Sequence, residues 1–159
     1  MNQPVQMYTD GAARGNPGPG GYGVILMSGK HHKELSQGYR RTTNNRMELM
    51  AVIAGLQALK KEGMNVTVFT DSQYVAKAIQ EGWLKNWIAT QFKGGKKNKD
   101  LWMQYHKLST KHYIKFVWVK GHADNPFNNR CDELATAAAD ASDLLVDEEY
   151  ENDKNSLLE

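Results

Sequence analysis

The sequence predicts a mixed α/β fold in which helices flank one central sheet. Short runs of alternating apolar residues fill the opening of the chain, interrupted by a stretch rich in glycine and proline. The apolar spacing then changes to the helical period at Asn44 or Asn45. Further on, two short strand-like runs lie between stretches of helical periodicity. This order of strands and helices is typical of a single-sheet α/β domain.

The first three elements are predicted to be strands that pair antiparallel as a meander. Residues 5–9, with the sequence VQMYT, alternate and are rich in strand-forming residues. Residues 11–23, with the sequence GAARGNPGPGGYG, are predicted to form a turn. The second strand is expected over residues 21–27 and the third over residues 33–41.

Within the glycine-rich stretch, Gly18, Gly20 and Gly23 match the spacing of a dinucleotide-binding loop. Pro17 and Pro19 stiffen this stretch, and a strand follows where the nucleotide-binding motif requires a helix. We therefore interpret it as a hairpin turn and not as a nucleotide loop.

A long helix is predicted to follow, starting at Asn44 or Asn45 and ending near Gly63. Five apolar residues recur at the spacing of one helix face: Leu49, Val52, Ile53, Leu56 and Leu59. Glycine commonly terminates such a pattern, because it readily adopts the left-handed conformation that ends a helix.

The second half of the chain alternates between apolar strands and amphipathic helices. The predicted strands cover residues 66–70 and 114–119. The predicted helices cover residues 72–82, 83–92, 100–112 and 126–141. Asp71 or Ser72 is expected to cap the first of these helices. Asn125 is expected to cap the last, with Pro126 at its first position.

Length and composition indicate one globular domain. A chain of 159 residues and 17.9 kDa can bury a substantial hydrophobic core. The single cysteine, Cys131, excludes an internal disulfide, and its apolar setting argues against a nucleophile. No apolar run approaches the roughly 20 residues of a membrane span, and the opening residues lack a signal-peptide pattern. We expect a monomeric, cytoplasmic protein with no membrane contact.

The net charge of +2 conceals an uneven distribution. Residues 143–159 contain seven acidic residues and one lysine, so the remaining 19 basic and 11 acidic residues leave +8 on the rest of the chain. A basic body favours a polyanionic partner such as nucleic acid, although basic faces also serve solubility alone. We predict a domain over residues 1–142 and a flexible tail over residues 143–159 that does not join the core.

Four acidic residues stand where carboxylates are poor core material: Asp10, Glu48, Asp71 and Asp132. Two lie at or near the ends of strand-like runs, and two lie in the opening turns of helix-like runs. Taken singly, each has a plain interpretation as a turn former, a helix cap or a polar helix residue. If the fold brings them together, a hard divalent cation with oxygen ligands would offset their repulsion. The joint pattern therefore predicts a magnesium site.

His122 lies in the loop between the last predicted strand and the last predicted helix, ten positions before Asp132. A loop histidine is more often a surface residue than a catalytic one. This loop leads toward the helix that carries Asp132, however, and the near-neutral pKa of an imidazole suits proton transfer. Both interpretations stay open at this point.

Aromatic and basic residues interleave after residue 82. Trp83 and Trp87 are four residues apart and share one helix face, and Lys96 and Lys97 follow in a glycine-containing loop. These residues either pack on the core beside a solvated loop or form a basic protrusion that grips a nucleic-acid backbone. Both roles can hold at once, and we favour nucleic-acid contact.

A polar cluster precedes the long helix: Arg41, Thr42, Thr43, Asn44 and Asn45. Its plain role is to start the helix with an Asn or Thr cap. Its functional role would be recognition of phosphate and sugar hydroxyls, because free N–H groups at a helix N-terminus favour anions. Amide side chains can also both donate to and accept from a ribose 2′-hydroxyl.

Four long blocks of the sequence resemble bacterial type-1 ribonuclease H: YTDGAARGNPGPGGYG, RTTNNRMELMA, TDSQYV and KGHADNPFNNRCDELA. They follow the order and spacing of that family and cover the chain from about Gln6 to Ala141. The resemblance implies a single mixed five-stranded sheet, with three antiparallel strands and later parallel additions. It also implies a sequence-independent endonuclease that cuts the RNA strand of RNA–DNA hybrids with two Mg²⁺ ions, or Mn²⁺ in their place.

The resemblance assigns roles to individual residues. The residues that match its metal-binding carboxylates are Asp10, Glu48, Asp71 and Asp132, and His122 matches a loop histidine that assists proton transfer or product departure. The residues that match minor-groove contacts are Asn16, Asn44, Asn45 and Gln73. Those that match a pocket for a DNA phosphate are Arg41, Thr43 and Asn98. Those that match the basic protrusion are Trp83, Trp87, Lys96 and Lys97. The acidic tail is not part of the family pattern.

Two other functions remain open on the sequence. One is a non-catalytic nucleic-acid-binding module of the same fold, in which the acidic residues are structural caps. The intact set of four carboxylates argues against it, because clustered negative charge facing phosphates does not help binding. The other is a related two-metal nuclease or strand transferase, against which the protrusion and the asparagine cluster argue.

Overall fold

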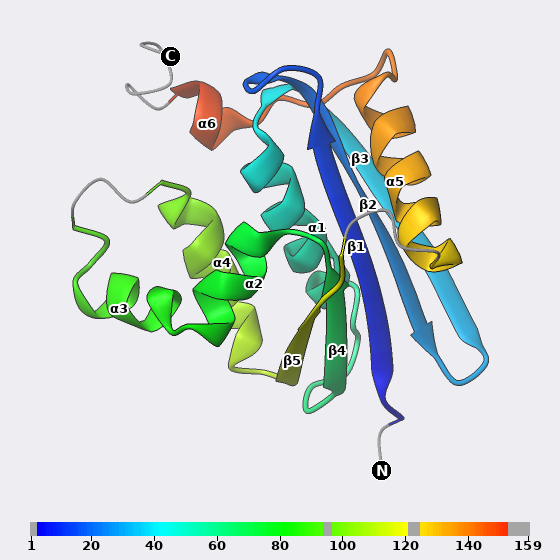
Figure 1. Cartoon of the computed structure of the whole chain (residues 1–159), viewed down its shortest axis with the longest axis vertical. Coiled ribbons are helices and arrows are strands. Elements are labelled where there is room, and N and C mark those ends of the chain that lie inside the picture. The colour runs from blue at the N-terminus through cyan, green and yellow to red at the C-terminus, as the bar shows by residue number, and fades with distance from the viewer. Residues whose placement is uncertain (1–2, 94–96, 121–124, 153–159) are drawn as a thin grey trace.

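The computed structural model describes residues 3–93, 97–120 and 125–152 and is built around one five-stranded sheet (Figure 1). The strands are β1 (Val5–Ala13), β2 (Gly18–Ser28), β3 (His31–Thr42), β4 (Asn65–Thr70) and β5 (Tyr113–Trp118). Their order across the sheet is β3-β2-β1-β4-β5. β1, β2 and β3 pair antiparallel, while β4 joins β1 and β5 joins β4 in parallel. The predicted mixed sheet is confirmed.

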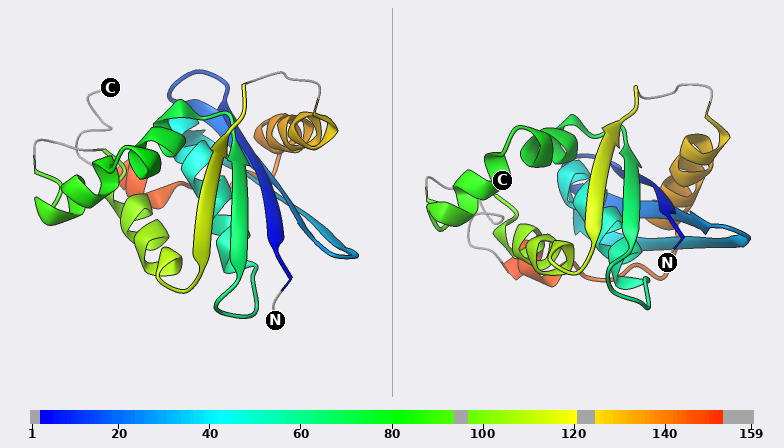
Figure 2. Two further views of the ribbon diagram at one scale, coloured as in Figure 1. Left: turned by 60° about the horizontal axis from the view of Figure 1, so that its bottom comes forward. Right: turned by 90° about the horizontal axis from the view of Figure 1, so that it is seen from below.

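Helices lie on both faces of this sheet. They are α1 (Asn44–Gln57), α2 (Gln73–Gln80), α3 (Trp83–Ala89), α4 (Lys99–Ser109), α5 (Pro126–Ala139) and α6 (Glu148–Asn152). Figure 2 shows α5 on one side of the sheet and α1 on the other. α4 packs on α1, and α3 extends outward from the body of the molecule (Figure 1).

Alternation along the strands divides the apolar side chains between the two faces. Met7 and Val24 belong to the large core under α1, which also contains the fully buried Trp102 of α4. Their neighbours Tyr8 and Ile25 point the other way, into a smaller cluster under α5. The strand period predicted for the opening of the chain therefore accounts for both cores.

The glycine-rich stretch contains less turn than the sequence predicts. β1 continues to Ala13 and β2 begins at Gly18, so only residues 14–17 connect them. Gly21 and Gly23 lie within β2 because α5 packs directly on their backbone. A Cβ at Gly21 would stand 2.5 Å from the carbonyl oxygen of Ala135. These glycines therefore serve helix–sheet contact, and the absence of a nucleotide loop is consistent with their place in a strand.

The helix starts follow short polar caps. Thr43 caps α1, with its Oγ1 accepting a hydrogen bond from the Arg46 amide at 3.2 Å. Ser72, one of the two residues proposed, caps α2. Asn125 caps α5 with Pro126 in the first turn, as predicted.

The end of α1 differs from the prediction. α1 stops at Gln57, and Gly63 instead lies in the following loop with φ +73°. The Gly63 amide donates to the Lys111 carbonyl at 2.7 Å, so this loop is tied to the turn after α4. Gly63 does adopt a left-handed conformation, which glycine tolerates, but it does so in a loop and not at the end of the helix.

The prediction that the acidic tail stays off the core is wrong for residues 143–152. Leu145 forms a bridge to Tyr39 at the edge of β3, and Asp147 is 3% exposed. The Asp147 carboxylate accepts hydrogen bonds from Arg46 Nε at 2.7 Å and Thr42 Oγ1 at 2.8 Å. The segment packs because its acidic residues meet arginines of the body. Residues 153–159 lie outside the described part of the chain.

Within the described ranges, none of the helices has the length and apolar character needed to cross a bilayer. The longest, α1 and α5, have 14 residues each.

We predict that Asp147→Ala lowers the free energy of unfolding by about 3 kcal/mol, because it leaves the buried Arg46 guanidinium with fewer partners. Urea denaturation monitored by circular dichroism would measure this loss. The matched control is Asp140→Ala, which breaks the exposed pair with Arg14 and should leave the free energy of unfolding nearly unchanged, because solvent screens exposed ion pairs. Equal losses in the two variants would contradict the packing of this segment.

Candidate active site

The acidic site forms where α1 crosses β1. Asp10 lies in β1, and Asp71 follows β4, the parallel neighbour of β1, so both carboxylates reach the same end of the sheet. Glu48 lies in the second turn of α1. Gly11 permits this contact, since a Cβ there would stand 2.5 Å from the Glu48 amide nitrogen. The absence of a side chain at Gly11 therefore brings Glu48 beside Asp10.

One backbone amide links two of these carboxylates. The Gly11 N–H donates to Asp10 Oδ1 at 2.9 Å and to Glu48 Oε1 at 3.2 Å. Oxygen atoms of Asp10, Glu48 and Asp71 all lie within 4.8 Å of one another. These three predicted residues are thus brought together within reach of a single cation.

Asp132 lies across the same cavity, on α5. The cavity has a volume of about 430 Å³ and is lined by Asp10, Glu48, Asp71 and Asp132 together with polar side chains of α1, α2 and α5. The charge of Asp132 is one of the influences on the pKa of Asp10. Asp132 therefore faces the cluster without belonging to the close group of three.

Proton affinity in the cluster is high. Burial, followed by the negative charge of Asp71, raises the pKa of Asp10 to about 7. Burial and the charges of Asp10 and Asp71 raise the pKa of Glu48 well above its ordinary value. Desolvation and like-charge repulsion both disfavour the ionised forms. A bound divalent cation would lower these pKa values again, because its positive charge favours the ionised carboxylates as ligands.

The donor set fits a hard cation. Glu48 Oε2 is buried and has no hydrogen-bond partner among the described residues. A buried carboxylate oxygen without a partner is costly, and metal coordination is one way to satisfy it. The ligand atoms are all oxygen, which suits Mg²⁺ or Mn²⁺ and not a thiolate-preferring metal.

Asn128 is a residue of this cavity that the sequence reasoning missed. It lines the cavity from α5, and its Oδ1 is buried without a hydrogen-bond partner among the described residues. It stands four residues before Asp132, one helical turn away, so the two side chains share a face. This spacing was the available signal.

The predicted groove residues fall into two neighbouring cavities. Asn44, Asn45 and Gln73 line the acidic cavity. A second cavity of about 330 Å³ is lined by Asn16, Pro17, Thr43, Asn45, Lys97, Asn98 and Tyr150. Asn45 borders both cavities and therefore connects the acidic site to the second cavity, whose lining, among the described residues, contains Lys97 and no acidic residue.

Hydrogen bonds fix the asparagines in this region. The Asn44 amide donates to Asn16 Oδ1 at 3.1 Å, and the Ala13 amide donates to Asn44 Oδ1 at 2.7 Å. These bonds join the β1–β2 turn to the start of α1. The polar cluster before the helix thus supplies the cap at Thr43, as predicted, and also lines both cavities, while its recognition of phosphate and sugar hydroxyls stays a prediction.

α3 carries its two tryptophans on one face, as predicted. The ring centroids of Trp83 and Trp87 are 6.4 Å apart, and Trp87 also packs against Trp102 at 5.8 Å. Trp87 therefore anchors α3 to the core, whereas Trp83 is 39% exposed. Neither residue lines the two cavities described above.

The predictions for four further residues have different outcomes. His122 and Lys96 lie outside the described residues. Arg41 does not line the second cavity, and its guanidinium lies 5.7 Å from the centroid of the Tyr150 ring. Burial raises the pKa of the Cys131 thiol to about 12, which argues against a nucleophile at that position.

The raised pKa values predict that the metal-free protein loses stability as the pH rises. Between about pH 4 and 7, folded Asp10 keeps a proton that the unfolded chain has released, so each pH step favours unfolding. Asp10→Asn removes this effect. In EDTA the variant should be more stable than the parent by about 1–2 kcal/mol at pH 8 and nearly equal at pH 4.

Urea denaturation at the two pH values would measure this difference. Adding Mg²⁺ at pH 8 should stabilise the parent more than the variant, because a ligand of the native state shifts its stability. A parent and variant that match at both pH values in EDTA would contradict the electrostatic strain assigned to the cluster.

Comparisons with known proteins agree with this fold and site. The family model described as RNase H matches residues 2–140. The protein named Ribonuclease H from Desulforamulus reducens is 56% identical over 147 residues, which cover 90% of this chain and 92% of that protein. The protein of the same name from Idiomarina loihiensis is 50% identical over 149 residues, 92% of this chain and 94% of that protein.

Solved structures extend the agreement to the three-dimensional fold. LC9-RNase H1, a type 1 RNase H with the type 2 active-site motif, superposes with a TM-score of 0.80 at 28% identity, covering 99% of this chain and 85% of that one. LC11-RNase H1 in complex with an RNA/DNA hybrid superposes with a TM-score of 0.65 at 27% identity, covering 86% and 96%. With its sequence blocks, sheet order and acidic cluster, this chain belongs to the ribonuclease H family.

Proposed function

We propose that this chain is an endonuclease that hydrolyses the RNA strand of RNA–DNA hybrids. The observation that carries the proposal is the group of carboxylate oxygens from Asp10, Glu48 and Asp71, within 4.8 Å of one another in an open polar cavity. Relatives named Ribonuclease H at about half identity support the same activity. Its role would be the removal of RNA primers and hybrids during replication.

The four carboxylates Asp10, Glu48, Asp71 and Asp132 would hold Mg²⁺, with two ions engaged during catalysis and Mn²⁺ able to substitute. Bound there, the ions would lower the pKa of a water molecule and offset the charge that develops on the scissile phosphate. The protein's own task is to keep these oxygens ionised and fixed. The Gly11 amide contributes to that task by donating to both Asp10 and Glu48.

Recognition of the hybrid rests on sugar and phosphate contacts. Asn44, Asn45 and Gln73, beside the carboxylates, have side-chain amides that can donate to and accept from a ribose 2′-hydroxyl. Asn16 supports Asn44 through the hydrogen bond between them. Such contacts distinguish RNA from DNA without reading bases, so cleavage is expected at many sequences.

The DNA strand would be held at the second cavity and at the basic protrusion. Thr43 and Asn98 line that cavity, and Arg41 lies beside it, so they would receive a DNA phosphate. Trp83 on α3 and the lysines that follow α3 would contact the backbone farther along. We also propose that His122 assists proton transfer, and that the protein acts as a cytoplasmic monomer.

We predict that an end-labelled RNA–DNA hybrid is cut in its RNA strand with Mg²⁺ and left intact in EDTA, while duplex DNA and duplex RNA remain uncut. Gel electrophoresis of the labelled products would measure this, with 5′-phosphate and 3′-hydroxyl ends expected. Asp10→Asn should lower the rate by at least about 100-fold while leaving hybrid affinity within a few-fold.

The matched control for this experiment is Asp140→Asn, an exposed carboxylate outside the cavities. It should cut at the parent rate. Binding without cutting by the parent would favour the non-catalytic module. Equal loss of binding and cutting in Asp10→Asn would instead assign Asp10 a structural role.

Replacing Lys96, Lys97 and Lys99 with glutamine should weaken hybrid binding at every sequence. Each lost phosphate contact should lower the slope of log affinity against log salt by up to about 0.9. Fluorescence anisotropy over a range of salt concentrations would measure the slope. The control is the triple substitution of Lys30, Lys60 and Lys61, which lie away from the cavities lined by the carboxylates and by Thr43. An unchanged slope in the first variant would remove the protrusion from the binding surface.

A further inference from the structure

The acidic C-terminal segment, defined here as residues 145–152, lies against the chain that leads from β3 into α1. Three successive residues at the end of β3 contact the segment: Arg40 contacts Leu145 and Glu151, Arg41 contacts Tyr150, and Thr42 contacts Asp147. The next residue, Thr43, caps α1 and lines the second cavity together with Tyr150. The C-terminal segment therefore borders the surface proposed to receive a DNA phosphate.

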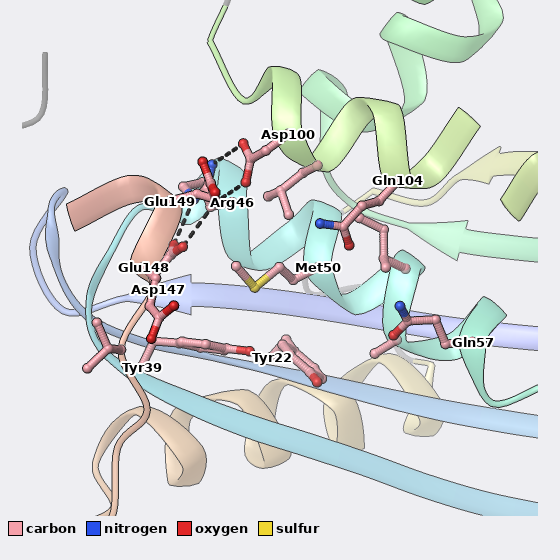
Figure 3. Close-up of a pocket in the computed structure, with 14 residues that line it drawn as sticks. Tyr22, Tyr39, Arg46, Met50, Gln57, Asp100, Gln104, Asp147, Glu148 and Glu149 are labelled. Atoms are coloured by element: carbon pink, nitrogen blue, oxygen red, sulfur yellow. Dashed lines mark hydrogen bonds and ion pairs between the residues drawn. The ribbon is translucent and has the colours of Figure 1, made fainter. Parts of the chain in front are cut away.

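One anchor of the segment is the buried carboxylate of Asp147. It accepts two hydrogen bonds from Arg46, at 2.7 and 2.9 Å, and one from Thr42. Arg46 also donates to both carboxylate oxygens of Asp100 on α4, at 2.9 and 2.7 Å. Figure 3 shows Arg46 between these two acidic residues. This anchor fixes the start of α6 to α1 and α4.

The second anchor is Glu151. Its two carboxylate oxygens accept from Arg40 Nε and Nη2, both at 2.9 Å, in a bidentate pair. Asp147 and Glu151 are four residues apart and hold the segment on either side of Tyr150. The Tyr150 side chain is consequently fixed in position, and it is 9% exposed.

The Tyr150 ring lies against two guanidinium groups, those of Arg41 and of Arg46, and the guanidinium carbon of Arg46 lies 5.9 Å from the ring centroid. The guanidinium carbon of Arg41 lies 5.7 Å from the ring centroid, within the range of a cation–π contact. An arginine side chain loses conformational entropy when a ligand fixes it in one rotamer. If a ring already restrains the guanidinium in the free protein, less entropy is lost when the ligand binds. Contact with Tyr150 thus restrains the Arg41 side chain.

Two residues that line the second cavity, Thr43 and Asn98, are arranged as hydrogen-bond donors. Thr43 Oγ1 accepts from the Arg46 amide, which leaves its hydroxyl proton to donate elsewhere. Asn98 Oδ1 accepts from Arg46 Nη1 at 3.2 Å, and Asn98 Nδ2 donates to the Tyr74 hydroxyl at 3.1 Å. With their acceptors engaged by Arg46, Thr43 and Asn98 offer N–H and O–H groups, which suit a phosphate.

We propose that Tyr150 is a positioning residue for the hybrid, acting through Arg41, and that the C-terminal segment is part of the substrate-binding surface. The inference rests on the proposed function, since it assumes that a phosphate of the hybrid occupies this cavity. It assigns to the acidic segment a role beyond stability: the segment carries the ring that borders the phosphate cavity and holds Arg41 beside it.

The test uses the full chain and four variants: Tyr150→Leu, Tyr150→Phe, Arg41→Ala and the double variant Tyr150→Leu with Arg41→Ala. Steady-state cleavage of a labelled hybrid in Mg²⁺ gives kcat and KM, and anisotropy in Ca²⁺ or EDTA gives the affinity. Tyr150→Leu should raise KM and Kd about three- to tenfold with kcat within about twofold, and Tyr150→Phe should behave as the parent. In the Arg41→Ala background, Tyr150→Leu should have little further effect.

The matched control is Tyr113→Leu. Tyr113 is 71% exposed and is the first residue of β5, which ends at Trp118. This substitution should leave KM and kcat unchanged. Thermal melting of every variant shows whether it is folded at the assay temperature, and Tyr150→Phe keeps the ring if Tyr150→Leu is destabilised.

Three results would overturn the inference alone. Two of them are a Tyr150→Leu variant with the KM and Kd of the parent, and an equally large loss caused by Tyr150→Leu in the Arg41→Ala background. A Tyr150→Phe variant as weak as Tyr150→Leu would also overturn it, because the aromatic face is retained. A parent chain that neither binds nor cuts the hybrid would overturn the proposed function together with this inference.

Discussion

The close contact between α1 and β1 at Gly11 is the constraint on which the site depends. It sets a helix backbone against a strand with no side chain between them, and so places Glu48 beside Asp10. The same backbone amide then donates to both carboxylates. A site that concentrates negative charge needs such rigid support, because its carboxylates repel one another when they are ionised.

The support continues along α1. Arg46 stands two residues before Glu48 and is buried between Asp100 and Asp147. Through these pairs the start of α1 is joined to α4 and to the C-terminal segment, while Thr43 closes its first turn. A buried guanidinium is stable only when its partners are in place, because an unpaired buried charge is costly. The ion pairs of Arg46 therefore restrict how these elements pack together. The first two turns of α1 therefore carry both Glu48 of the acidic cluster and Arg46, the cation that joins α1 to the surrounding elements.

The sequence predicted the sheet, the helix order and the acidic residues, because each of these depends on local pattern. Strand alternation identified β1 and β2, and a carboxylate at the end of a strand identified Asp71. Contacts between distant residues left weaker traces. Nothing in the local sequence links Asp147 to Arg46, so the acidic tail was predicted to be solvated although Asp147 and Tyr150 are buried. The sequence predicted a turn at the glycines of β2. Their actual role is contact with α5, which cannot be inferred locally because that helix is more than 100 residues away in the chain.

That contact between β2 and α5 has a consequence for the shape of the acidic cavity. Asp132 belongs to α5, whose distance from the sheet is limited by the bare backbone at Gly21 and Gly23. A larger residue at either position would push the helix outward and carry Asp132 away from Asp10, Glu48 and Asp71. The width of the carboxylate-lined cavity thus depends on two residues that contribute no polar side chain to it. The packing distance between α5 and the glycine backbone of β2 therefore sets how far Asp132 stands from the other three carboxylates.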